Sequence, residues 1–245
     1  MIQQRDFYAA NISDSSTGAV AVYDKNKKLI SRTTTEDKAK AIKLNKGNNQ
    51  FVWDMQYPSA EKIDDLILWN GVPAGITAMP GNYTAIVSVD KDSVEVPFTL
   101  LADPNYVCTQ ADYDAQLDFL LQIQGKFNET MKGIKDIRSA RTQMKDFVSK
   151  QGKDCPKEIK QMSDSLSKEL TAVEEKLHQT KAKSGQDVLN YPIRLDDKLG
   201  GVYDMVSSGN MAPSKQARDV YAELAVQVDA EMSKLKGILD GGIKS

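Results

Sequence analysis

Histidine and cysteine are scarce in this sequence of 245 residues, which has one histidine and two cysteines. A tetrahedral zinc centre takes four ligands, so one His and two separated Cys cannot build one. A hydrolytic triad needs a base beside a nucleophile, and His178 falls late in a predicted helix, with neither a Gly-x-Ser-x-Gly elbow nor a partner cysteine. We therefore interpret His178 as a helix-surface histidine and predict a non-enzyme, with no catalytic residue, no metal site and no cofactor.

An excess of charge and a long apolar run are also missing. The 32 Lys and Arg residues nearly balance 34 Asp and Glu, which gives a net charge of −2. Such a chain has no long-range field for nucleic acid or an anionic membrane. No apolar stretch approaches the ~20 residues of a membrane helix, and the polar N-terminus lacks the apolar region of a signal peptide. We expect no nucleic-acid partner and no membrane span, in a chain that is either cytoplasmic or a piece of a longer protein.

Glycine and acid pairs do not form recognisable sites. The pair Gly200 and Gly201 does not fit a phosphate-binding loop. The acid pairs Asp64–Asp65 and Asp196–Asp197 lack the spaced ligands and fixed glycine of a calcium loop. We interpret these acids as turn or helix-cap residues.

The first hundred residues have a hydrophobic period of two. The segments GAVAVYDKNKKLISR and QFVWDMQY predict short strands, and residues 82–101 predict a hairpin around the DKDS turn. Several short strands with turns at this spacing are typical of an immunoglobulin-like fold. We predict a flexible N-terminal segment over 1–15 and an immunoglobulin-like antiparallel β-sandwich over 16–105.

From about residue 109 the period becomes helical. Apolar residues step by three and four along three stretches, 117–147, 159–177 and 220–239. Long amphipathic helices bury their apolar stripes against one another. We therefore predict an up-down-up three-helix bundle over 106–245.

A long connection over 184–212 interrupts the helical pattern, and we expect a short helix within it, around Leu195 to Val206. The first helix is expected to be about 40 residues long, so at about 1.5 Å per residue its ends lie some 60 Å apart. Cys108 and Cys155 precede two antiparallel helices at opposite ends of this length, so we predict two free thiols.

Aromatic residues supply the strongest candidate site. In NNQFVWDMQYP, residues 48–58, Trp53 and Tyr57 share one parity, whereas the other parity is mostly polar. One face of a sandwich strand must pack inward, and burying a large aromatic contributes about 1.5–3 kcal/mol, so we expect Trp53 and Tyr57 in the core. Trp69, before a turn, is either core or surface. Sugar binding would instead require at least two exposed rings on one flat face, among Trp53, Tyr57, Trp69 and Tyr83.

The segments GNNQFVWDMQYPSAEK, ILWNG, AMPGNYTAIVSVD and PFTLLADP carry a resemblance. They resemble the C-terminal region of exported Bacteroidota proteins, which follows a sortilin-like β-propeller of BNR (Asp-box) repeats and is often described as glycosyl-hydrolase-like. The likeness continues through QADYDAQLDFLLQIQGKFNETMKGIKDIRSAR and YPIRLDDKLGGVYDMV and spans roughly residues 45–240. It implies an immunoglobulin-like domain followed by a helical segment, in an exported protein that is periplasmic or on the cell surface. No Asp-box is present here, so no propeller chemistry is transferred.

The sequence and the resemblance leave three candidate functions. The favoured one is a non-catalytic accessory or interaction module that contacts the upstream β-propeller of its parent chain or another protein. The first alternative is a carbohydrate-binding module that uses Trp53, Tyr57, Trp69 and Tyr83 to bind a glycan. The second is a small hydrolase, which would require a pocket with convergent polar groups and perturbed carboxylates.

Overall fold

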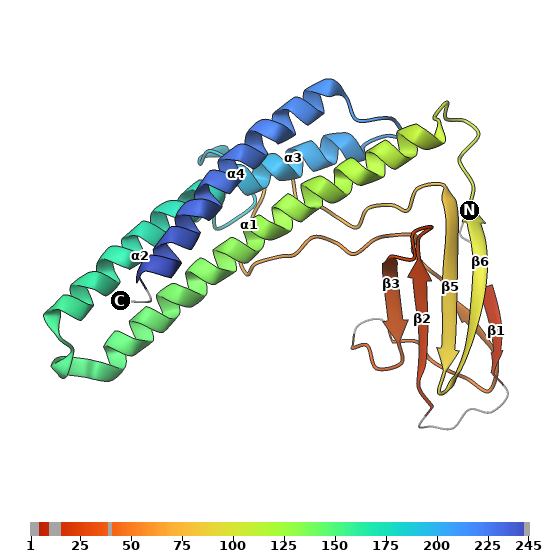
Figure 1. The fold of residues 1–245 in the computed structure, drawn as a ribbon, viewed down its shortest axis with the longest axis horizontal. Helices are drawn as coiled ribbons and strands as arrows, with labels where there is room; N and C mark the ends of the chain where they lie inside the picture. Colours follow the sequence, from red (N-terminus) through yellow and green to blue (C-terminus); the bar gives the residue numbers. More distant parts are fainter. Residues whose placement is uncertain (1–4, 10–15, 39–40, 243–245) are drawn as a thin grey trace. The chain divides into compact units, whose positions relative to one another are not determined.

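The computed structural model describes residues 5–9, 16–38 and 41–242, and they fall into two compact units (Figure 1). The sheet unit comprises Met1–Ser59, Gly75–Leu117 and Asn210–Ala212. The helical unit comprises Ala60–Ala74, Asp118–Gly209 and Pro213–Ser245. The flexible segment expected over 1–15 lies outside the described residues, apart from a strand at Arg5–Ala9.

Within its described residues, the sheet unit has two antiparallel sheets. One has four strands in the order β3-β2-β5-β6, and the other pairs β1 with β4. Their bounds are β1 Arg5–Ala9, β2 Gly18–Tyr23, β3 Leu29–Thr34, β4 Gly47–Phe51, β5 Gly81–Val89 and β6 Asp92–Leu100. The predicted hairpin is confirmed as β5 and β6, which pair Tyr83 with Phe98 and Val89 with Asp92.

The predicted immunoglobulin-like sandwich is wrong. The structure has one small four-stranded sheet and a two-stranded pair, in place of two packed sheets. The error lies at residues 51–57, where alternating apolar residues suggested a strand. The strand ends at Phe51, Met55 takes a left-handed φ of 56°, and Gln56 forms only an isolated bridge to Thr77. An irregular segment here does the packing that a strand of a second sheet would do.

Trp53 is the residue of this segment that covers the sheet. Its ring lies 5.8 Å from that of Tyr83 and 6.2 Å from that of Phe98, centroid to centroid. The Tyr83 hydroxyl donates a hydrogen bond of 2.6 Å to the carbonyl of Met79. An aromatic cluster therefore forms part of the core of the sheet unit, beside the buried Val20, Val22, Ile30 and Ile76.

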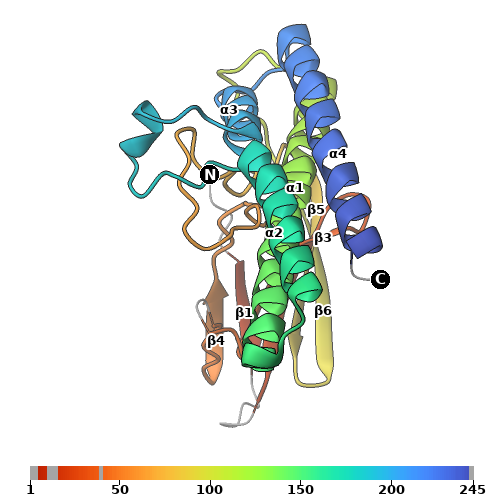
Figure 2. The ribbon, with the colours of Figure 1, turned by 90° about the vertical axis from the view of Figure 1, so that its left-hand side faces the viewer.

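The helical elements are four α-helices and two short 3-10 turns in the described residues (Figures 1 and 2). Their bounds are α1 Gln110–Gln151, η1 Gly152–Asp154, α2 Lys157–Leu177, η2 Asp187–Leu189, α3 Leu195–Ser207 and α4 Lys215–Gly242. The predicted three-helix bundle is wrong, because α3 packs against α4 as a fourth member. Together with the four-stranded sheet, these helices make the chain a mixed α and β protein.

The helical core follows the apolar stripes of the sequence. Phe127, Met131, Ile134 and Ile137 are fully buried along α1. Periodicity placed a short helix near α3 but did not include it in the bundle. Its apolar face is buried nonetheless, through Leu195, Leu199, Val202, Tyr203 and Val206. The sequence therefore predicted where α3 lies in the chain, but the prediction that it stands outside the bundle was wrong.

The two cysteines, Cys108 and Cys155, are free, as predicted. No helix in the described part of the chain is long and apolar enough to cross a membrane. Within the same residues, no group of three or more His, Cys, Asp or Glu side chains is placed to hold a metal ion.

Candidate functional site

A groove of about 830 Å³ lies within the helical unit, between α1 and α2. We call it the cationic groove, and it is lined by four segments of that unit. The lining residues are Asp65 and Ile67; Arg138, Arg141, Thr142, Lys145 and Val148; Lys160, Ser163, Asp164, Ser167, Thr171 and Glu174; and His178, Gln179, Thr180, Ala182 and Lys183.

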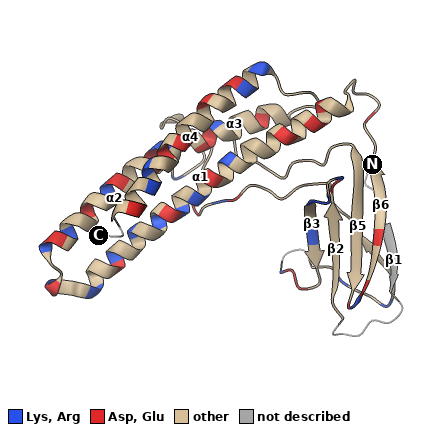
Figure 3. Ribbon diagram, in the orientation of Figure 1, with Lys and Arg blue, Asp and Glu red and all other residues tan. Residues whose placement is uncertain are grey.

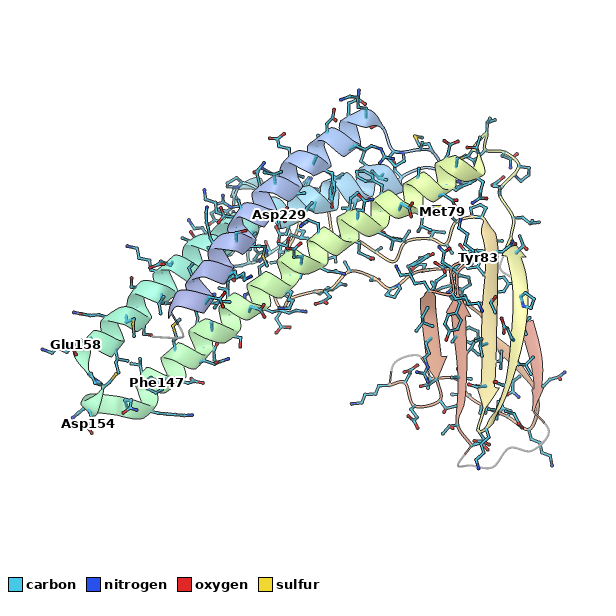
Figure 4. All side chains as sticks on the ribbon, in the orientation of Figure 1. Met79, Tyr83, Phe147, Asp154, Glu158 and Asp229 are labelled. Atoms are coloured by element: carbon cyan, nitrogen blue, oxygen red, sulfur yellow. The ribbon has the colours of Figure 1, made fainter. Side chains whose placement is uncertain are left out.

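The two helices of the groove run antiparallel, joined at η1, near which Figure 4 labels Phe147 and Glu158. Hydrogen bonds fix their register, because Arg138 contacts Glu174 and Arg141 contacts both Thr171 and Glu174. Continuing this register toward η1 places Lys145 opposite Ser167. The groove therefore follows the helix axes.

Glu174 holds the two arginines in place. Its carboxylate is only 2% exposed; Arg138 Nε lies 2.7 Å from one oxygen, and Arg141 Nη2 contacts the other. Arg138 also donates to the carbonyl of Asp64 at 3.0 Å, and Arg141 donates to the Thr171 hydroxyl at 2.9 Å. A guanidinium has five donors in a fixed fork, so each arginine retains donors for a further anionic group.

Three lysines add positive charge to the groove, which Asp65 and Asp164 offset only in part. Lys145, Lys160 and Lys183 are exposed, and none forms an ion pair with another described residue. Five cationic and three anionic side chains line the groove, a net charge of +2 with His178 neutral. The whole chain carries −2. Figure 3 shows Lys and Arg interspersed with Asp and Glu along both α1 and α2, so the positive charge of the groove comes from the side chains that line it. The groove is therefore a cationic region in an acidic protein.

His178 also lines this groove, and its predicted place on a helix surface is wrong. It follows the last residue of α2, with an extended backbone, and is 2% exposed. Its Nδ1 lies 2.7 Å from Oδ2 of Asp196, in the first turn of α3. Burial raises the pKa of Asp196, and the hydrogen bond with His178 opposes that rise. The pair ties the end of α2 to the start of α3.

Asp197 fixes another wall of the groove. Its carboxylate accepts the backbone N–H groups of Trp69 and Asn70, each at 2.9 Å. The Asn70 side-chain amide donates to the same carboxylate and to the Asp197 carbonyl. Residues 60–74, which contribute Asp65 and Ile67 to the groove, are thereby held against α3. Asp196 and Asp197 are cross-links between segments, which goes beyond the turn or cap role expected for them.

The aromatic residues singled out in the sequence do not form one exposed surface. Trp53, Tyr57 and Tyr83 are buried, in agreement with the core packing expected of the first two. Trp69 is 58% exposed and belongs to the other unit. A sugar-binding platform of at least two exposed rings is therefore not available among these four residues.

Sequence reasoning missed the residues of the cationic groove. One signal was present, because Arg138, Arg141 and Lys145 follow a spacing of three and four and must share a helix face. The partners on α2 and the pairing of His178 with Asp196 depend on helix register and on the path of the connection. Neither was visible in a local pattern.

The chain matches no protein-family model, no curated protein and no solved structure in comparisons with known proteins. The resemblance to β-propeller proteins therefore stays a prediction.

Proposed function

We propose that the chain is a non-catalytic interaction module and that its helical unit holds an anionic group of a partner in the cationic groove. The observation that carries this proposal is the pair of arginines fixed by buried Glu174, beside three lysines without an ion pair in the described residues. Arginines already held in position lose little conformational freedom when an anion arrives.

The contacts of His178 favour binding over hydrolysis. A triad requires the histidine within hydrogen-bond reach of a nucleophile. The contact of His178 Nδ1 with Asp196 is one that a triad histidine also makes, but in the described part of the chain no hydrogen bond joins the ring to Ser163 or Ser167. The carboxylate of Glu174 is occupied by two arginines, which makes it a poor general base. An upstream β-propeller and an exported location are further predictions that this proposal accommodates.

Anion binding is tested by thermal unfolding at low ionic strength. Tripolyphosphate and citrate should raise the Tm, because a ligand that binds only the folded state stabilises it. Added NaCl should weaken the effect by screening. Neutral oligosaccharides should leave the Tm unchanged.

A pair of matched variants assigns the effect to the groove. Lys145→Glu/Lys160→Glu should abolish the response. Lys150→Glu/Lys236→Glu makes the same change in net charge at exposed lysines outside the groove and should keep it. A Tm that no anion raises, or that rises equally in both variants, contradicts the proposal.

A further inference from the structure

The length of the cationic groove indicates what kind of anion it accepts. Its lining runs from Arg138 to Val148 on α1 and from Lys160 to Glu174 on α2. At about 1.5 Å per residue these stretches are about 15 and 21 Å long. A single carboxylate or phosphate would occupy one end and leave the rest empty.

Positive charge is distributed along this length. Arg138 and Arg141 lie toward the end at His178, whereas Lys145 and Lys160 lie toward η1. Lys183 adds a cation from the segment that follows α2. A ligand that meets all of these groups needs anionic groups repeated along an extended chain.

The remaining lining residues favour a peptide over a sugar as the ligand of the groove. No Phe, Tyr or Trp lines the groove, all of whose lining residues lie within the described ranges, and the imidazole of His178 is 2% exposed, so no ring is available for a sugar face to pack on. Ser163, Ser167 and Thr180 supply hydroxyl side chains instead, whereas the hydroxyls of Thr142 and Thr171 already donate to the backbone carbonyls of Arg138 and Ser167. Hydroxyls both donate and accept, as the N–H and C=O groups of an extended peptide require.

We propose that the cationic groove binds an extended segment rich in Asp and Glu from a partner protein. This inference rests on the proposed function and specifies the ligand of the same site. An extended strand advances about 3.4 Å per residue, so the groove accommodates about six residues. Carboxylates of the segment then pair with the arginines at one end and the lysines at the other.

Fluorescence anisotropy with labelled oligoglutamate tests the proposal on the full chain at low ionic strength. A peptide of about six glutamates should bind, and one of about two should bind at least about tenfold more weakly, because it cannot reach both groups of cations. Lys145→Glu/Lys160→Glu should weaken binding of the longer peptide at least about tenfold, whereas Lys150→Glu/Lys236→Glu should change it less than about twofold. Circular dichroism checks that both variants are folded.

Competition distinguishes failure of this inference from failure of the proposed function. If citrate, inorganic phosphate or an oligouronate displaces the probe as well as unlabelled oligoglutamate does, anion binding stands and the peptide inference is overturned. The same conclusion follows if both peptide lengths bind equally. If no anion binds, or the groove variant and its control behave alike, both proposals are overturned.

Discussion

The carboxylate of Glu174 determines how the arginines of the cationic groove are held. It is buried, whereas Arg138 and Arg141 remain about a third exposed, at 33% and 27% of their side chains. Removing one member of a buried ion pair leaves the other charges poorly solvated. The effect is reduced here because water still reaches the arginines.

Glu174→Gln should destabilise the helical unit by about 2 kcal/mol, below the ~3–5 kcal/mol of a fully buried pair. The glutamine oxygen retains one acceptor but loses the charge that two guanidinium groups share. Urea unfolding followed at 222 nm measures the change. Glu175→Gln, at the exposed neighbouring position, should change stability by less than about 0.5 kcal/mol. Equal effects would mean that the buried ion pairs add no stability.

Tyr203 gives a pH-dependent prediction. Its hydroxyl donates to the carbonyl of Ala74 at 2.7 Å, and burial raises the pKa of Tyr203 from 10.0 to about 12. Between pH 10 and 12 the unfolded chain releases this proton while the folded chain keeps it. The contribution of Tyr203 to stability is therefore complete below pH 10 and declines as the pH rises toward 12.

Tyr203→Phe should cost about 1 kcal/mol at neutral pH, the net value of one hydrogen bond. The difference in unfolding free energy between the native sequence and this variant should shrink from pH 10 upward. Urea titrations at several pH values measure it, and because the chain has nine tyrosines, the difference in tyrosinate absorbance between the native sequence and Tyr203→Phe locates the ionisation of Tyr203. A difference that stays constant with pH, or an ionisation near pH 10, would contradict the burial argument.

At the scale of helices and strands, the hydrophobic period of the sequence predicted most of the elements. It did not predict the tertiary contacts between them. Steps of three and four located the helices because each stripe lies against other helices, as at Ile134 and Leu170. Alternation failed at residues 51–57, because an irregular segment can also turn every second side chain inward. Trp53 is buried as expected, yet residues 52–55 belong to no strand and Gln56 forms only an isolated bridge to Thr77.

The groove was less accessible to sequence reasoning than the helices. The shared face of Arg138, Arg141 and Lys145 follows from helical spacing. Their partner Glu174 comes from another helix, and His178 meets Asp196 across a connection of 17 residues with no regular period. Long-range pairing of this kind depends on packing, which no short window of sequence encodes.

Two helical glycines test close packing at the same scale. A Cβ on Gly125 in α1 would meet no atom within 4 Å. A Cβ on Gly200 in α3 would lie 2.8 Å from the backbone oxygen of Gly71. That oxygen belongs to the segment that Asp197 holds in place, so moving it away would cost the hydrogen bonds that Asp197 accepts from Trp69 and Asn70.

Gly125→Ala should therefore stabilise the protein by about 0.8–1 kcal/mol through helix propensity. Gly200→Ala should destabilise it by about 1–3 kcal/mol despite the same gain, because of the clash with Gly71. Thermal and urea unfolding show whether each variant is more or less stable than the native sequence. A stabilising Gly200→Ala would mean that residues 60–74 do not pack closely on α3.

At the scale of the whole chain, each unit has its own core and its own tryptophan. Trp53 is in the sheet unit and Trp69 in the helical unit. Trp53→Phe and Trp69→Phe therefore give single-tryptophan proteins that report on one unit each. Emission of Trp53 should be blue-shifted and poorly quenched by acrylamide, and that of the exposed Trp69 red-shifted and readily quenched.

These reporters test whether the two cores unfold independently. Ile137 is fully buried in the helical core, so Ile137→Ala should cost about 2–5 kcal/mol. In urea, the transition seen by Trp69 should move to lower denaturant, while that seen by Trp53 keeps its midpoint, because separate cores unfold as separate cooperative units. Each variant is compared with its own single-tryptophan parent, which removes the effect of the reporter substitution. Helix α1 contributes residues to both units, with Gln110–Leu117 in the sheet unit. Equal shifts of both midpoints would therefore mean that α1 couples the two cores into one cooperative structure.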